Sequence, residues 1–258
     1  MRTEHSLFTS QFVKHVLLEL RIFLIDARFE TTALFINFIL PSALLIIAIR
    51  TAPQQNLTDE AVTRVIFQFT TYICLTTVMN LVISFLVASR EDGNLLVHTH
   101  IFGSPKPYIW GLIVGQSTIC AGEALALSVL GMLLTRNFHW TVIIAVLIGA
   151  PLVTTVLSLF FLPLVLWKAT ANNSAAVITI LLLVLFNIPG KASHPVLSFL
   201  LQLNPVYFSQ NVQLLLFSPT KLITITQMIS CVAVLLLAAF AGSVTLKKFP
   251  LRPLLKRA

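Results

Sequence analysis

Glu123 is an acidic side chain well inside an apolar stretch, in Ala121-Gly122-Glu123-Ala124. An ionised carboxylate that faces lipid costs several kcal/mol, so this side chain must face protein or water. A place in a translocation path, a polar contact between helices of two subunits, and a hydrogen-bonded packing contact all meet that condition. Asn80 and Gln116 are weaker candidates of the same kind, and hydrogen bonds between helices explain them first.

Patterns typical of catalytic or nucleotide sites do not occur in the sequence. The phosphate-loop pattern G-x-x-x-x-G-K-[ST], the zinc pattern H-E-x-x-H and the nucleophile pattern G-x-S-x-G are all missing. Cys74, Cys120 and Cys231 lie far apart in apolar runs, which favours neither a disulfide framework nor a metal site. We therefore predict no catalytic residue, metal site or cofactor in this chain, and we expect that it is not an enzyme.

The composition is that of a protein that lies within a membrane. The chain has 258 residues, of which 57% are hydrophobic and 10% are charged. Soluble domains have roughly 25% charged residues, and so few charges cannot cover a water-facing surface. With a mean hydropathy of +0.93, the chain is predicted to be an integral membrane protein.

The apolar runs predict an all-α, polytopic membrane protein with one transmembrane domain, 1–258. Residues 6–28 show helical spacing of apolar residues, which indicates an amphipathic helix on the membrane surface. Pro and Gly interrupt residues 189–220, which fits short interfacial or re-entrant helices. Six spans of about 20 residues, the length that crosses a bilayer, are predicted at 31–49, 65–88, 109–134, 141–166, 170–188 and 222–246.

Lys and Arg residues are distributed unevenly over the predicted loops. Most of them lie in the two terminal segments and in the loops that six spans place on the same side as the termini. The positive-inside rule then puts both termini in the cytoplasm, and the plasma (inner) membrane is the expected location. Anionic headgroups account for the net charge of +8, so no nucleic-acid partner is implied.

Two short motifs and the overall layout resemble the permease subunits of ABC-2 type exporters. Residues Arg90-Glu91-Asp92-Gly93-Asn94-Leu95-Leu96, followed by Ser104-Pro105 and Gly115, are similar to the family's R-E-x-G-T-L stretch, its later Pro and its Gly. Leu203-Asn204-Pro205 is similar to the L-N-P before the final helix. Asn94 stands in place of the usual Thr, and Gln116 stands where the family often has Lys.

The resemblance implies a mechanical role for the loop at 89–108. In this family such a loop forms a coupling helix that docks into a separate ATPase subunit, and the N-terminal helix borders that subunit. Two ATPase copies bind ATP and Mg²⁺, and two permease chains, identical or different, enclose the path. The coupling residues would be Arg90, Glu91, Asp92, Gly93, Leu95, Leu96 and Pro105. Segment 189–220 would be an outer gate, with Asn204, Pro205 and Tyr207.

The leading interpretation is thus a permease subunit that exports a hydrophobic or amphipathic cargo such as a drug, an antimicrobial peptide or a lipid-like molecule. The alternative is a secondary transporter that is driven by an ion gradient and uses Glu123 as its ion site. Such transporters usually show repeated halves and helices broken at mid-membrane, and no clear repeat is visible here. An intramembrane enzyme would need a nucleophile and base or a metal constellation within the spans.

Overall fold

The computed structural model describes residues 2–26, 31–51, 59–167, 171–188, 195–217 and 224–249, with the side chains of 11–23 and 37–51 described for the first two helices. These residues form helices and no strand, which confirms the all-α prediction. A π-helical segment, η2 (Thr77–Ile83), and a 3₁₀ segment, η3 (Leu162–Leu166), interrupt the α-helices. The α-helices are α1 (Arg2–Asp26), α2 (Thr31–Thr51), α3 (Asp59–Thr76), α4 (Ser84–Glu91), α5 (Asn94–Phe102), α6 (Lys106–Thr135), α7 (Trp140–Phe161), α8 (Ala171–Asn187), α9 (Pro195–Gln202), α10 (Pro205–Phe217) and α11 (Ile225–Lys247).

Within the described ranges, four helices are long and apolar enough to cross a membrane. They are Asp59–Glu91, which joins α3, η2 and α4, then Lys106–Thr135, Trp140–Leu166 and Ile225–Lys247. They correspond to the predicted spans 65–88, 109–134, 141–166 and 222–246. The predicted spans 31–49 and 170–188 coincide with α2 and α8, whose described apolar parts are shorter. A membrane protein is supported, and six spans stay a prediction.

The first of these helices begins six residues before the predicted boundary. Asp59 and Glu60 form its first turn, where the partial positive charge of a helix N-terminus stabilises carboxylates. The helix has 33 residues and is therefore about 50 Å long, which exceeds the hydrocarbon thickness of about 30 Å. Its ends must therefore project beyond the apolar layer or the helix must tilt.

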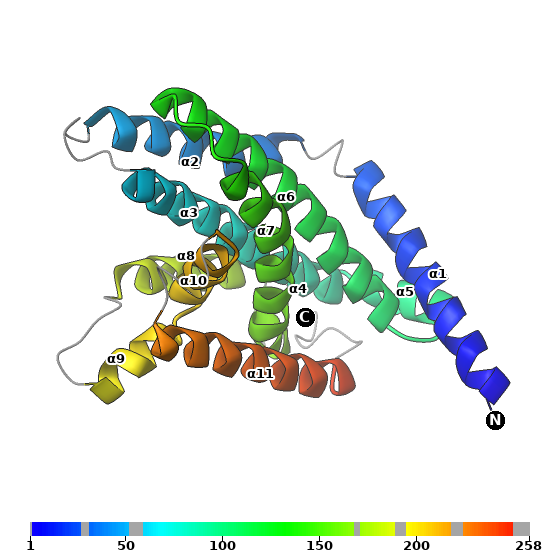
Figure 1. The fold of residues 1–258 in the computed structure, drawn as a ribbon. Helices are drawn as coiled ribbons and strands as arrows, with labels where there is room; N and C mark the ends of the chain where they lie inside the picture. Colours follow the sequence, from blue (N-terminus) through cyan, green and yellow to red (C-terminus); the bar gives the residue numbers. More distant parts are fainter. Residues whose placement is uncertain are drawn as a thin grey trace.

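The helices form a bundle in which α7 is central. Figure 1 shows α6 crossing the upper part of the molecule with α1 beside its N-terminal half, and α11 running along the lower edge. α7 packs against α6, α10 and α11, while α3 packs against α2, α6 and α10. The continuous helix Asp59–Glu91 is the most buried of the four long helices, and α11 leaves side chains such as Leu236 and Phe240 exposed. An exposed apolar face of this kind suits contact with lipid.

The segments predicted as coupling loop and outer gate both contain short helices. In the segment predicted at 89–108, residues 89–91 end α4, residues 94–102 form α5, and α6 begins at Lys106. Within segment 189–220 the described residues form α9 and α10, and residues 189–194 and 218–220 lie outside the described ranges. The amphipathic helix expected at 6–28 corresponds to α1, and residues 27 and 28 lie outside the described ranges as well.

Candidate functional site

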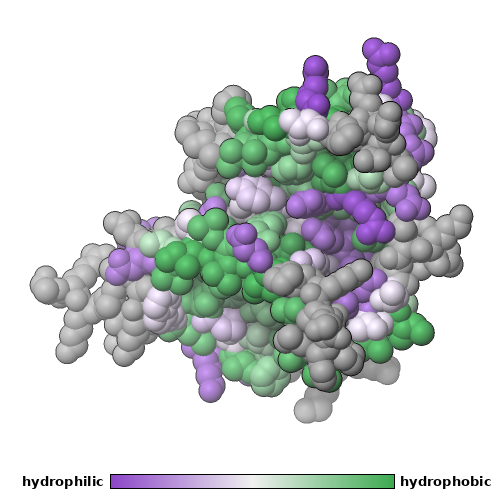
Figure 2. Space-filling view, turned by 90° about the vertical axis from the view of Figure 1, so that its left-hand side faces the viewer, coloured by the Kyte–Doolittle hydropathy of each residue, from purple (hydrophilic) through white to green (hydrophobic). Residues whose placement is uncertain are grey.

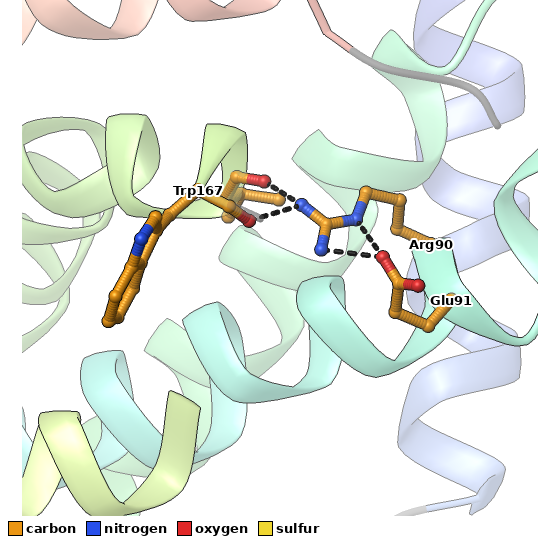
Figure 3. A network of polar contacts seen from close by, with 4 residues as sticks. Arg90, Glu91 and Trp167 are labelled. Carbon is orange, nitrogen blue, oxygen red and sulfur yellow. Dashed lines mark hydrogen bonds and ion pairs between the residues drawn. The ribbon is translucent and has the colours of Figure 1, made fainter. Parts of the chain in front are cut away.

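Arg90, at the end of α4, is fully buried with 0% of its side chain exposed. Its Nη1 donates to the backbone carbonyl of Val165 and, at 3.1 Å, to that of Trp167. Its Nε donates to Glu91 Oε1 at 2.7 Å, and its Nη2 lies 2.6 Å from the same oxygen (Figure 3). The guanidinium thus joins the end of α4 to the end of η3.

The chemistry of this joint suits arginine in particular. The last carbonyls of a helical segment have no partner within the helix, and a cation there also meets the negative end of the helix dipole. A guanidinium has five donors in a rigid planar fork, so it can bind the Glu91 oxygen through two nitrogens and both carbonyls through the third. Because Arg90 is buried inside the chain, it positions α4 rather than offering a surface to a partner, which modifies the sequence-based assignment.

Two glycines in the left-handed region delimit α5. Gly93 has φ 81° and Gly103 has φ 71°, values that cost a residue with a Cβ atom about 1 kcal/mol or more. A Cβ atom at either glycine would meet no other atom within 4 Å, so backbone conformation and not crowding requires glycine there. Leu96 and Val97 donate their backbone N–H groups to the Gly93 carbonyl, which starts the helix.

The helix α5 has one buried side and one exposed side. Leu95 is buried, whereas 56% of Val97 and 66% of Ile101 is exposed. Asp92 is exposed just before the helix, and Leu96 is half-buried. Two well-exposed aliphatic side chains on a short polar connection are a candidate contact for another protein.

The helix α1 is attached to α5 and α6 through a buried carboxylate. Glu19 is fully buried, and its Oε1 lies 2.7 Å from His98 Nδ1. The His98 ring lies 4.4 Å from the Tyr108 ring, and the Tyr108 hydroxyl hydrogen-bonds to Ser89 at 2.9 Å. Glu19 belongs to the helix predicted at 6–28 to lie on the membrane surface, whereas the structure buries it where α1 packs against α6.

The close approach of α1 to α6 depends on Gly111. A Cβ atom at this position would lie 2.5 Å from Glu19 Cβ and 3.3 Å from the backbone nitrogen of Leu20. Any side chain at Gly111 therefore forces the two helices apart. The hydrogen bond between Glu19 and His98 exists because this glycine has no side chain.

Glu123 lies in a polar cluster formed by α2, α3, η2 and α6. Asn37 Nδ2 donates to Glu123 Oε2 at 2.9 Å and to the Thr77 hydroxyl at 3.1 Å. The Thr76 hydroxyl donates to Asn37 Oδ1 at 2.6 Å. The sequence predicts that Glu123 faces protein or water, and here it contacts protein; among the described residues, its buried Oε1 has no hydrogen-bond partner.

The other two predicted intramembrane residues do not join this cluster. Asn80 is exposed on η2, and Gln116 has a buried Oε1 without a hydrogen-bond partner. Asn37 was missed, although an Asn within the apolar run 31–49 is a detectable signal. The π-helical segment η2 begins directly at Thr77, and π-helical turns occur frequently at functional sites.

The predicted gate residues tie α10 to the end of α8. Asn204 Nδ2 donates to the Leu185 carbonyl at 2.7 Å, and Tyr207 Oη donates to the Ile188 carbonyl at 2.9 Å. Asn204 Oδ1 also accepts from the Val206 N–H at 2.9 Å, and Pro205 occupies the first position of α10. This arrangement explains the Asn-Pro pair as a helix start with a polar anchor.

Polar side chains also line the buried side of α10. Thr70 donates to Gln213 Oε1 at 2.6 Å, and Thr71 and Ser209 share a hydrogen bond of 2.9 Å. Gln227 of α11 donates to Asn211 Oδ1 at 3.2 Å. These bonds hold α10 against α3 and α11, which the interrupted sequence of this segment did not indicate.

Two cysteines that are distant in sequence meet in the core. Cys74 Sγ lies 3.7 Å from Cys120 Sγ, and both side chains are fully buried as free thiols. Across the described part of the chain, no group of three or more His, Cys, Asp or Glu side chains is arranged to hold a metal ion. The two thiols form a packing contact between α3 and α6.

Comparison with known proteins places the chain in no group: no family model, no curated protein and no solved structure matches it.

Proposed function

We propose that this chain is the membrane-spanning permease subunit of an ATP-driven ABC exporter, working with a separate ATPase subunit. The observation that carries the proposal is α5, a short helix between two long apolar helices that exposes Val97 and Ile101 while other elements hold it firmly. A chain without a nucleotide site can be driven by a partner if that partner binds its two conformations with different affinity.

The contacts around α5 give such a partner a route into the bundle. Through Gly93, α5 follows directly on α4, and Arg90 connects α4 to the carbonyls of Val165 and Trp167 at the end of η3. On its other side, His98 connects α5 to Glu19 of α1 and to Tyr108 of α6. A displacement of α5 would therefore act on the ends of three long helices at once.

The complete transporter would contain two permease chains and two ATPase copies, and the ATPases would bind ATP and Mg²⁺. The Lys and Arg distribution favours a plasma (inner) membrane location with α5 and both termini in the cytoplasm. The segment with α9 and α10 would then lie toward the outer side and act as a gate, anchored by Asn204 and Tyr207. The apolar character of the helices favours a hydrophobic or amphipathic cargo.

The test is purification of the tagged chain from its native cells in mild detergent, followed by mass spectrometry and an ATPase assay. An ATP-hydrolysing protein in about equal amount is expected, and Ile101→Asp should remove it because a charge replaces the exposed aliphatic contact. Asn94→Asp is the matched control, since it adds the same charge to an exposed position of the same helix. Recovery of the chain alone under several mild detergents would contradict the proposal.

A second candidate, an ion-gradient-driven secondary transporter, is favoured by the cluster of Glu123, Asn37, Thr76 and Thr77. Carboxylate, amide and hydroxyl oxygens converge there beside an irregular helical segment. Uptake or efflux driven by an imposed ion gradient in vesicles without ATP, and lost in Glu123→Gln, would establish this candidate. Transport that requires ATP and a second protein would exclude it.

A further inference from the structure

A pocket lies between α3 and α10, at the end of the molecule where α3 begins. Its volume is about 130 Å³, and its lining consists of Arg64, Phe67, Gln68, Gln210 and Leu214. Arg64 and Gln68 are four residues apart on α3, as Gln210 and Leu214 are on α10, so each pair shares one helix face. Figure 2 looks onto this end of the molecule and shows hydrophilic residues gathered between hydrophobic ones.

The pocket has an apolar floor and a polar rim. Phe67 is 1% exposed and Leu214 is 6% exposed, and the Phe67 ring packs edge-on against Phe217 at 5.9 Å. Arg64 and Gln68 are exposed, and Gln210 is half-buried. One guanidinium and two side-chain amides therefore surround the opening above hydrocarbon side chains.

Arg64 forms no ion pair within the described part of the chain, although the exposed carboxylate of Glu60 lies one helical turn before it on α3. The nearby Asp59 instead accepts a hydrogen bond from Asn137 and lies 3.4 Å from His139 Nε2. The guanidinium is thus available to an anion that enters the pocket.

The size and the donors of the pocket favour a phosphate group. The pocket volume of about 130 Å³ has room for several water molecules or one small oxyanion, since about 10–15 Å³ of such space holds one water. The guanidinium fork matches two oxygens of a phosphate, and amide NH₂ groups supply further donors. The apolar floor suits the first carbons of the molecule that carries the phosphate.

We propose that this pocket is a binding site for a phosphate group, carried by an anionic phospholipid headgroup or present as free phosphate. The location at the end of a long apolar helix brings the pocket to the level at which headgroups lie. The site is separate from α5 and its neighbours, so the inference does not depend on the proposed transport function.

The experiment measures phospholipid retention by the full chain in detergent, using native mass spectrometry with equal amounts of phosphatidylglycerol and phosphatidylcholine. The wild-type chain should retain phosphatidylglycerol preferentially, and Arg64→Gln should weaken that retention about tenfold, because the charge-assisted bonds are lost. Arg50→Gln is the matched control, since Arg50 is an exposed arginine near the end of α2 that does not line the pocket. This control should retain the lipid like the wild type.

A phosphate titration distinguishes the two sources of phosphate, and a second pocket variant tests the site if the first variant does not fold. If added inorganic phosphate displaces the lipid and raises the thermal stability of the wild type but not of Arg64→Gln, the ligand is free phosphate. If added phosphate has no such effect, the ligand is the lipid headgroup. Gln210→Leu removes a donor at similar size and should also weaken retention if Arg64→Gln fails to fold. Equal retention of both lipids together with no stabilisation of the wild type by inorganic phosphate, or undiminished retention of phosphatidylglycerol in both pocket variants, would overturn the proposal.

Discussion

Arg90 illustrates how one residue can connect elements that are distant in sequence. Its guanidinium binds Glu91 beside it and the carbonyl of Val165, 75 positions away. Removal of a buried charge leaves its partners without hydrogen bonds, and breaking a buried pair costs about 3–5 kcal/mol. The side chain therefore contributes to stability as well as to the position of α5.

We expect Arg90→Gln to lower the thermal unfolding midpoint in detergent by about 5–10 °C, because the carbonyls of Val165 and Trp167 and the Glu91 carboxylate lose their cation. Arg90→Lys should recover only part of the loss, since an ammonium lacks the planar fork. Arg50→Gln, at an exposed position, is the control and should change the midpoint little. An unchanged midpoint in Arg90→Gln would show that the joint contributes nothing.

Glu91 and Gly93 test the coupling role of α5, with membrane insertion of the variant as the control. If α5 couples to an ATPase, replacing both Glu91 and Gly93 by Ala should abolish transport and cargo-stimulated ATP hydrolysis while the chain still inserts into the membrane. The Glu91 carboxylate would no longer hold Arg90, and a Cβ atom at φ 81° would strain the turn before α5. Normal transport by this variant would contradict the coupling assignment.

At the scale of elements, the contact between α1 and α6 depends on a single glycine. A side chain at Gly111 collides with Glu19 Cβ, whereas a Cβ atom at Gly122 on the same helix meets no atom within 4 Å. The two glycines therefore form a matched pair, with one at the helix contact and one in open space.

We expect Gly111→Ala to detach α1 from α6, because the Cβ contact of 2.5 Å can be relieved only by moving the backbone. Limited proteolysis in detergent should then cleave the N-terminal 30 residues or so at least about tenfold faster, as local opening of a poorly packed helix allows. Gly122→Ala should be cleaved at the wild-type rate. Equal rates for the two variants would refute the packing of α1 on α6.

At the scale of the whole molecule, the number of membrane spans can be measured through the sidedness of α2 and α8. If α2 crosses the membrane, Gln11 and Arg50 lie on opposite sides; if α8 crosses, Trp167 and Asn187 do. All four side chains are exposed, while the three native cysteines are buried and should not react. The helices are therefore well suited to labelling of added cysteines.

We expect Gln11→Cys and Trp167→Cys to be protected from an impermeant maleimide in intact cells, and Arg50→Cys and Asn187→Cys to react. This pattern follows from six spans with both termini in the cytoplasm. Permeabilised cells, in which all four should react, supply the control. If the members of either pair behave alike, the helix between them does not span the membrane.

Membrane residence and the helix positions could be predicted from the sequence because hydrophobic runs act locally: about 20 apolar residues require a membrane wherever the rest of the chain lies. The requirement that Glu123 faces protein or water, and not lipid, followed from the same physics. The side-chain partners could not be predicted, since Glu123 meets Asn37 across 86 positions and Glu19 meets His98 across 79.

Only the tertiary structure decided that Arg90 and Glu19 are buried, that two left-handed glycines delimit α5, and that α3 and α10 line an open pocket. A helical periodicity shows which residues share a face, but every face of a helix in an apolar bundle can meet lipid or another helix. The choice between them depends on close approach, as at Gly111, and on hydrogen-bond partners that the chain brings together only when it folds.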